Sequence, residues 1–270
     1  MRRLSVAVLA AASAVAFIQI ASAADLPRKA PPAPLPPPYS WTGFYVGGNI
    51  GYSWGNTDST VLIPDLALAG FGSFTDSLKP DGVIGGGQIG YNWQVDPRWV
   101  LGIEADFQGS GQKDSTSFSR SFTLPIIIGD FPVTGTGTFS HEVKLEWFGT
   151  VRGRVGYILW NNGMVYATGG LAYGRIKSSV SGAVTLTIGT ASATSSATFS
   201  DSDTKLGWTV GAGVEGQMFD SRNWTWKVEY LYMDLGTVER SFIHPTLGPV
   251  STSTSLTDNI VRLGINYRFN

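Results

Sequence analysis

The segment Thr257–Phe269 limits the possible folds of this chain more than any other, because apolar and polar residues alternate along it to the C-terminal end. The apolar series is Val261, Leu263, Ile265, Tyr267 and Phe269, and the residues between them are Arg262, Gly264, Asn266 and Arg268. A period of two is that of a β-strand with two unlike faces. Two arginines on one face and an aromatic end on the other predict a strand with lipid outside and a polar lumen inside.

The N-terminal part predicts a secreted chain with a short leader. Arg2 and Arg3 precede an apolar run, which closes on Ala21, Ser22 and Ala23, so residues 1–23 are expected to be a cleaved signal peptide. An uncleaved membrane anchor is the alternative. Residues 24–40 contain seven prolines and predict an extended periplasmic leader. A solvated spacer is the simpler interpretation, and a contact with peptidoglycan or periplasmic proteins is the other.

From residue 41 to residue 270 the pattern predicts an all-β domain, a transmembrane eight-stranded antiparallel up-and-down β-barrel. The predicted strands are the segments with alternating faces: Gly43–Trp54, Gly82–Val95, Trp99–Phe107, His141–Tyr157, Met164–Ile176, Lys205–Met218, Asn223–Tyr232 and Thr257–Phe269. Low charge (14% of residues) and a mean hydropathy of +0.06 fit such a barrel, in which a lipid-facing and a lumen-facing surface average out.

The connections between these strands alternate between short and long. The short ones are the turns 96–98, 161–163 and 220–222, and the long ones are Gly55–Asp81, Gln108–Ser140, Lys177–Thr204 and Leu235–Thr257. Outer-membrane barrels have short periplasmic turns and long surface loops. With an even number of strands, both termini are expected in the periplasm and the long loops outside the cell, in the outer membrane of a Gram-negative bacterium.

Large aromatic residues at the predicted strand ends suggest two rings at the membrane interfaces. This set consists of Trp41, Trp54, Trp93, Trp99, Trp160, Trp208, Trp224, Trp226 and Phe269. Most of them adjoin the short turns, and Trp54 and Trp208 adjoin the long loops.

The polar faces of the predicted strands carry balanced charges. They are Glu104, Asp106, Glu142, Glu146, Glu215 and Glu229 against Lys144, Arg152, Arg154, Lys227, Arg262 and Arg268. The interior of an eight-stranded barrel is just wide enough to be filled by side chains. We therefore expect a lumen charge network that pairs across the barrel and fills it, and a narrow ion path through the same residues is the alternative.

Other chemistry has weak support. The chain has no cysteine, so disulfides and thiolate sites are excluded, and its net charge of −1 gives no sign of nucleic-acid binding. Gly85–Gly90 and Gly211–Gly216 match a dinucleotide-binding pattern but lie inside predicted strands. His141 and His244 are the only histidines. A serine–histidine hydrolase site at the outer rim, or a haem ligand, remains a minor alternative, and we expect no enzyme, cofactor or metal site.

Three short segments carry a family resemblance: Ala24-Asp-Leu-Pro, the run Trp41-Thr-Gly-Phe-Tyr-Val-Gly-Gly-Asn-Ile-Gly-Tyr, and Asn266-Tyr-Arg-Phe. They resemble the RopB-like major outer-membrane proteins of rhizobia, brucellae and bartonellae. The C-terminal strand also resembles the signal by which outer-membrane barrels are assembled, which implies the barrel assembly machinery as a partner during biogenesis, although here Asn270 follows the terminal aromatic.

The resemblance implies an eight-stranded surface barrel that contributes to envelope integrity, with exposed extracellular loops. Such proteins are also described as porins, and some relatives have been linked to haem. We therefore expect a structural and surface role, with a small-solute porin as the alternative and a haem-binding or other ligand-binding surface protein as a further one. The expected partners are outer-membrane lipids, and a monomer is expected because a closed barrel has no free edges.

Overall fold

A computed structural model describes residues 39–62, 73–160, 162–219, 221–244 and 248–269. The predicted signal peptide and nearly all of the leader lie outside the described residues. No helix in the described part of the chain is long and apolar enough to cross a membrane.

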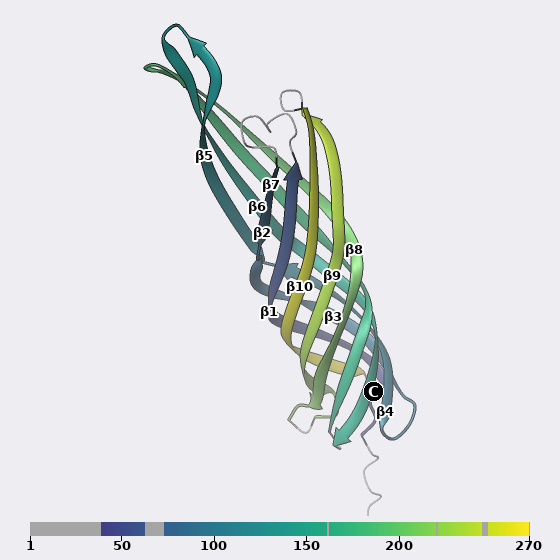
Figure 1. Ribbon diagram of the computed structural model, residues 1–270. Coiled ribbons are helices and arrows are strands. Elements are labelled where there is room, and N and C mark those ends of the chain that lie inside the picture. The colour runs from purple at the N-terminus through teal and green to yellow at the C-terminus, as the bar shows by residue number, and fades with distance from the viewer. Residues whose placement is uncertain (1–38, 63–72, 161, 220, 245–247, 270) are drawn as a thin grey trace, which may run out of the picture. The chain divides into compact units, whose positions relative to one another are not determined.

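The described residues form ten antiparallel strands in one sheet, shown in Figure 1. Their bounds are β1 Gly43–Leu62, β2 Ser73–Leu78, β3 Asp81–Gln94, β4 Trp99–Ser110, β5 Lys113–Ile128, β6 Phe131–Trp160, β7 Gly163–Ile188, β8 Ala191–Gln217, β9 Trp224–His244 and β10 Gly248–Phe269. Eight of them pair in the order β1-β10-β9-β8-β7-β6-β4-β3, and β3 pairs again with β1, so the sheet closes into a barrel. The predicted eight-stranded barrel is confirmed.

The C-terminal strand closes this ring. β10 pairs with β1 from Phe44↔Phe269 to Leu62↔Ser251, and its other edge pairs with β9. The tight turns predicted at 96–98, 161–163 and 220–222 join β3 to β4, β6 to β7 and β8 to β9 at one end of the barrel, here called the turn end. The opposite end is called the loop end.

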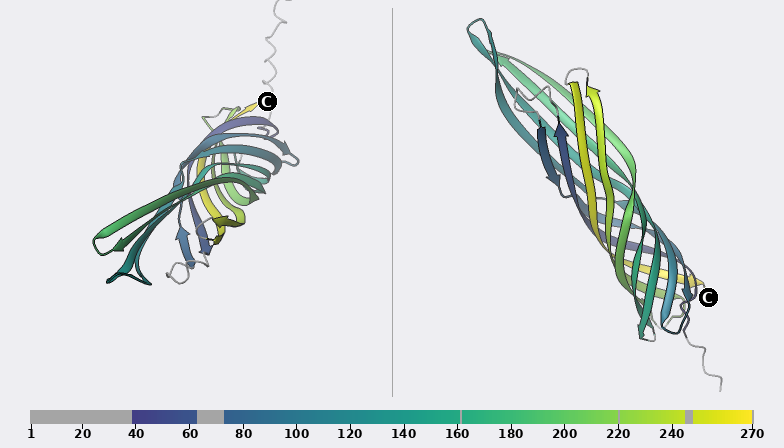
Figure 2. Two further views of the ribbon diagram at one scale, coloured as in Figure 1. Left: turned by 90° about the horizontal axis from the view of Figure 1, so that it is seen from above. Right: turned by 45° about the vertical axis from the view of Figure 1, so that its right-hand side comes forward.

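The long connections were predicted as loops, and in large part this is wrong. β6, β7 and β8 continue far beyond the barrel ring, and β5 pairs along β6. Two hairpins therefore project from the loop end, as both views in Figure 2 show. Their sequences are rich in threonine, serine and glycine, and these residues separate the apolar ones, such as Phe118, Phe122, Val133 and Phe139, so that the alternation is weak. Threonine nevertheless favours extended backbone, and the ladders end in tight turns with positive φ at Gly129 (65°) and Gly189 (59°).

Three predicted lumen residues, Glu142, Lys144 and Glu146, lie on the outside of the sheet instead, because β6 contains a bulge. Leu145 pairs with Ile176 and Trp147 with Arg175, so Glu146 is the extra residue. One extra residue reverses which face each side chain occupies. Glu142 and Lys144 form an exposed ion pair at 2.8 Å, whereas Leu145 is buried.

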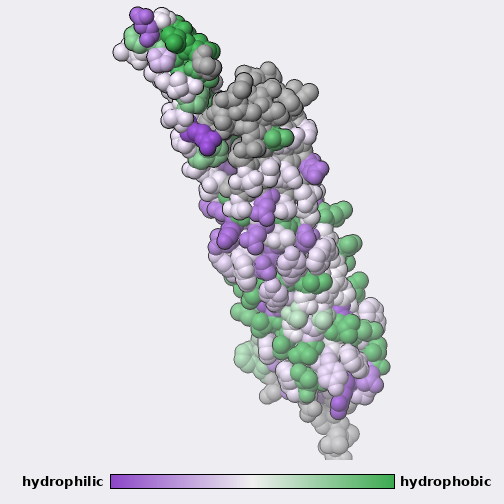
Figure 3. All heavy atoms as spheres, in the orientation of Figure 1, coloured by the Kyte–Doolittle hydropathy of each residue, from purple (hydrophilic) through white to green (hydrophobic). Residues whose placement is uncertain are grey.

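The outer face of the ring is an apolar belt, visible as green patches on the lower half of Figure 3. All but one of the predicted interface aromatics are exposed on this face, at 37% to 50% of their surface. The exception is Trp41, which is fully buried. Its odd-numbered position places it on the same inward face as Tyr45, so the prediction of Trp41 as an interface residue is wrong.

The bulge predicts unequal effects of neighbouring substitutions in β6. Leu145→Ala should lower the free energy of unfolding by about 2–5 kcal/mol, because it opens a cavity in a packed interior. The double change Glu142→Ala and Lys144→Ala should alter it by less than about 1 kcal/mol, because exposed ion pairs contribute little. Guanidinium titration in phospholipid vesicles, followed by tryptophan fluorescence, measures both, and equal effects would contradict the bulge.

Candidate functional site

The centre of the barrel holds an equal number of buried acidic and basic side chains. The acids are Glu104, Asp106, Glu215 and Glu229, and the bases are Arg152, Arg154, Lys227 and Arg262. We call these eight residues the lumen network. They belong to the set of charges predicted from the sequence, and each is at most 5% exposed. Because isolated charges are costly to bury, the pairing within this set decides whether the arrangement is stable.

Two arginines join the acids on different strands. Arg152 of β6 lies 2.5 Å from Glu104, 2.9 Å from Asp106 and 3.0 Å from Glu229. Arg262 of β10 contacts the same acids from the other side, at 2.5 Å from Glu229 and 2.9 Å from Asp106. Lys227 adds contacts of 2.8 Å to both oxygens of Glu104. The charges therefore neutralise one another across β4, β6, β9 and β10.

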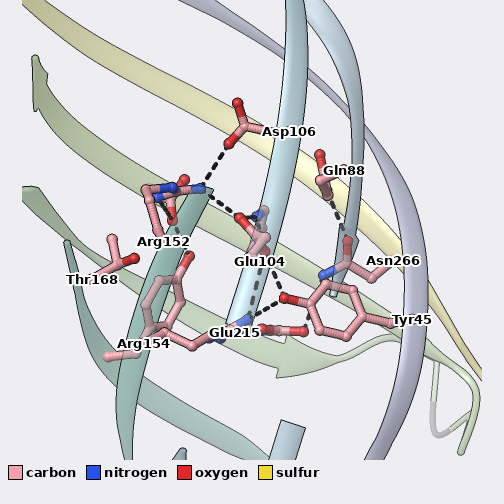
Figure 4. Close-up of polar contacts among 12 residues, drawn as sticks. Tyr45, Gln88, Glu104, Asp106, Arg152, Arg154, Thr168, Glu215 and Asn266 are labelled. Carbon is pink, nitrogen blue, oxygen red and sulfur yellow. Dashed lines mark hydrogen bonds and ion pairs between the residues drawn. The ribbon is translucent and has the colours of Figure 1, made fainter. Parts of the chain in front are cut away.

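The other part of the lumen network is built on Arg154, whose side chain points toward both Glu215 and Tyr45 in Figure 4. Its guanidinium donates to Glu215 at 2.6 Å and to the Tyr45 hydroxyl at 3.1 Å, and it stacks on the Tyr166 ring at 4.1 Å. The hydroxyls of both tyrosines donate to acids, Tyr45 to Glu104 at 2.7 Å and Tyr166 to Glu229 at 3.0 Å. The two tyrosines thus connect β1 and β7 to the lumen network.

Glycine makes room for these rings. A Cβ at Gly90 would lie 2.3 Å from the Tyr45 hydroxyl, and a Cβ at Gly213 would lie 2.5 Å from that of Tyr166. Any larger residue would displace the tyrosines, so the glycines found along the predicted strands have a packing role here.

Arg268 is buried, as predicted, but it does not join the carboxylates. It lies at the turn end, where it hydrogen-bonds to the Tyr39 hydroxyl and to the Ser40 carbonyl oxygen and lies over the rings of Tyr39 and Trp41 at 5.0 and 5.3 Å. Trp41 packs with Val100 and Met164. Trp41, Val100 and Met164 form an apolar layer on the turn-end side of the lumen network, which we call the floor.

An apolar roof covers the lumen network on the side of the loop end, and the alternation along the strands does not predict it. It consists of Ile84, Leu145, Phe148, Ala172, Leu231, Met233, Leu235, Leu256 and Ile260. Leu231 and Met233 have the same parity as Lys227 and Glu229, so the inward face of β9 changes from charged to apolar along the strand. The lumen is therefore filled in three layers: floor, lumen network and roof.

One buried carboxylate lies apart, beside the roof. On β10 the apolar belt ends, toward the loop end, at Val261. Asp258 lies three residues nearer to the loop end than Val261 and is therefore outside the belt. It accepts hydrogen bonds from the Ser53 hydroxyl at 2.6 Å and from the Gln112 amide at 3.0 Å. It forms no ion pair within the described residues. Burial raises the pKa of the Asp258 carboxyl to about 6, and the two hydrogen bonds act in the opposite direction.

The histidine alternatives receive limited structural support. The His141 Nε2 atom lies 3.0 Å from the Ser178 hydroxyl, across the β6–β7 pairing, which is one contact of the kind a serine hydrolase uses. The side chain of His244 lies outside the described side chains. Among the described residues, no group of three or more potential ligands could hold a metal ion.

Comparison with known proteins finds a family model, relatives and solved structures that this chain is similar to. The family model described as the outer membrane protein beta-barrel domain matches residues 7–269. The 31 kDa outer-membrane immunogenic protein of Brucella melitensis is 39% identical over 270 residues, covering 97% of this chain and 99% of that protein. A 22 kDa outer membrane protein of Rhizobium leguminosarum is 33% identical and covers 88% of this chain and 82% of its own length. Among solved structures, the outer membrane protein OprG of Pseudomonas aeruginosa is 9% identical with a TM-score of 0.44, covering 87% of this chain and 100% of that chain.

The ion pairs of the lumen network predict that removing one charge destabilises the barrel more than removing both charges of a pair. Arg262→Met should lower the free energy of unfolding by about 3–5 kcal/mol, because it leaves buried carboxylates without a partner. Adding Glu229→Gln should recover part of this loss by restoring the balance of charge. The control is Arg175→Met, since Arg175 is exposed and pairs with Glu146 at 3.4 Å. A double variant that is as unstable as the sum of the two single variants would contradict the pairing.

Asp258 predicts a pH dependence of stability. Because the pKa of about 6 in the folded chain exceeds the ordinary value of 3.8, the folded state binds the proton more tightly. This contribution to stability is complete below about pH 4 and is lost as the pH rises through 6. Asp258→Asn should therefore flatten the profile between pH 4 and pH 6 relative to Asp130→Asn in an exposed turn. Parallel profiles of the two variants would contradict this assignment.

Proposed function

Because this chain belongs to the outer membrane protein beta-barrel family and is a protein of the outer membrane, we propose that it is a non-enzymatic, closed barrel that contributes to envelope integrity and presents long hairpins at the cell surface. The observation that supports this proposal most strongly is the filling of the lumen. Floor, lumen network and roof occupy the volume through which a solute would pass.

The contacts of the lumen network favour a role in stabilising the barrel over a role in transport. Its charged members come from β4, β6, β8, β9 and β10, and Tyr45 and Tyr166 add β1 and β7. In a pore, charges line the wall and face water. Here each of these side chains contacts a partner on another strand, so removal of a charge leaves its partners buried without compensation.

The orientation follows from the asymmetry of the two ends. Tight turns lie at the turn end, and the hairpins that project from the loop end are continuations of long strands, of which β6 has 30 residues in all. In outer-membrane barrels the short turns face the periplasm and the long connections face outward. We therefore place the turn end, with the N-terminal leader and the C-terminus, in the periplasm.

The proposed partners follow from the same arrangement. Outer-membrane lipids contact the apolar belt, the barrel assembly machinery inserts the chain, and the closed ring functions as a monomer. Contact of the leader with peptidoglycan or periplasmic proteins remains part of this proposal.

The role in the envelope can be tested by complementation of a deletion strain. We expect the deletion to increase sensitivity to detergent and leakage of periplasmic proteins, and the full-length chain to reverse both. A hairpin-trimmed variant lacking Gly182–Thr187 and Ser192–Ala197 should reverse them equally, since these residues pair with one another above the ring and the turn at Gly189 is kept.

The matched control is Arg262→Met, which alters the lumen and keeps both hairpins. It should restore less of the barrier, because less folded barrel accumulates. If the trimmed variant failed and Arg262→Met succeeded at normal abundance, the contribution to the envelope would reside in the hairpins and not in the barrel.

A further inference from the structure

The far tip of the projecting hairpins carries a group of exposed apolar side chains, which we call the apolar tip. It consists of Ile126, Ile127, Ile128, Phe131 and Leu186, with exposed fractions of 51%, 72%, 52%, 56% and 38%. Figure 3 shows an apolar patch at this extremity. Neither the barrel nor the lumen network explains its presence, because it lies well beyond both.

The two hairpins form this tip together. Ile128 pairs with Phe131 at the end of the β5–β6 hairpin, and Val133 pairs with Ile188 of β7. A Cβ at Gly189 would lie 3.3 Å from the Phe131 ring, so this ring packs over the turn of the β7–β8 hairpin. The apolar tip is therefore one surface on two paired hairpins.

The apolar tip is exposed on both faces of the sheet. Successive strand residues point to opposite faces, yet three consecutive isoleucines, 126 to 128, are all exposed. A groove in a folded protein covers one face of a hairpin. A lipid layer surrounds both faces at once and favours backbone paired in a hairpin, as Ile127↔Pro132 and Ile128↔Phe131 are next to the turn, above a register shift between Thr123 and Ile127.

The charge around the apolar tip also matches lipid. Between Arg120 and Glu142 the sequence has one charged residue, Asp130, and between Lys177 and Asp201 it has none. Without lysine or arginine near the tip, attraction to anionic headgroups is not available. The apolar tip therefore complements the interface of a zwitterionic bilayer, where Asp130 of its turn stays among the headgroups.

The position of the apolar tip indicates which bilayer it can reach. Phe131 is 16 residues from Trp147, an aromatic on the outer face at the loop end of the ring. At about 3.3 Å per residue, this length of strand extends roughly 50 Å. We propose that the apolar tip inserts into the interface of a second, facing phospholipid bilayer. For the identity of that bilayer the inference rests on the outward orientation proposed above, but the lipid contact itself does not.

The absence of native cysteine allows a direct test with the full chain in nanodiscs. Ile127→Cys and Thr136→Cys, the latter an exposed control lower on the same hairpin, are labelled with the environment-sensitive dye NBD. Addition of phosphatidylcholine vesicles should brighten and blue-shift the dye at position 127 and leave that at 136 unchanged. The same response should occur with vesicles that contain phosphatidylserine and in high salt.

A second measurement is co-flotation of the nanodiscs with the vesicles. The double variant Ile128→Asp with Phe131→Asp should reduce co-flotation by at least about tenfold, whereas Thr134→Asp with Thr136→Asp should not. The heat-dependent mobility of each variant on gels checks that it is folded.

In the dye experiment, no response at position 127, or equal responses at positions 127 and 136, would overturn the proposal. A response before vesicles are added would indicate the protein's own bilayer or a second copy, and a response limited to anionic vesicles would indicate headgroup binding. Either of these two results would also overturn the proposed insertion into a second bilayer. Neither result would affect the proposed contribution of the barrel to envelope integrity.

Discussion

The buried ion pairs in the lumen are the interaction on which the rest of the structure depends. Eight charged side chains are stable in this interior only because the four acids and four bases are in contact. That contact requires each strand to present the correct face, since a shift of one residue would move a charge from the lumen into lipid. The lumen network therefore fixes the register of the barrel, and the closed ring in turn keeps the lumen network dry.

The alternation of apolar and polar residues was sufficient to predict the ring, because lipid on one side and charge on the other give each strand two unlike faces. Prediction failed where a face changes character along a strand. The adjacent large residues Trp147 and Phe148 interrupt the alternation in β6 and were the available sign of the bulge. Strict alternation carried through this position without a break places Glu142, Lys144 and Glu146 on the wrong face.

The candidate site was predictable as a set of inward charges, but its boundaries were not. Trp41 has the parity of Tyr45 and closes the floor, and Leu231 and Met233 continue the inward face of β9 as the roof. Periodicity says which face a residue occupies, and it does not say where a polar lumen ends. The projecting hairpins escaped prediction for a different reason: threonine, serine and glycine separate the apolar residues of their less exposed face, such as Phe122, Val133 and Phe139, and so weaken the alternation along each strand.

The central claim is that side chains close the lumen, and single-channel recording in planar bilayers tests it most directly. The refolded chain from residue 24 to residue 270 is compared with the double variant Arg152→Ala and Arg154→Ala, which removes two guanidinium groups from the lumen network. The account predicts no discrete openings for the native chain and conductance in the variant. Steady openings of the native chain, with an ion selectivity that shifts in the variant, would contradict the account and identify the barrel as a pore.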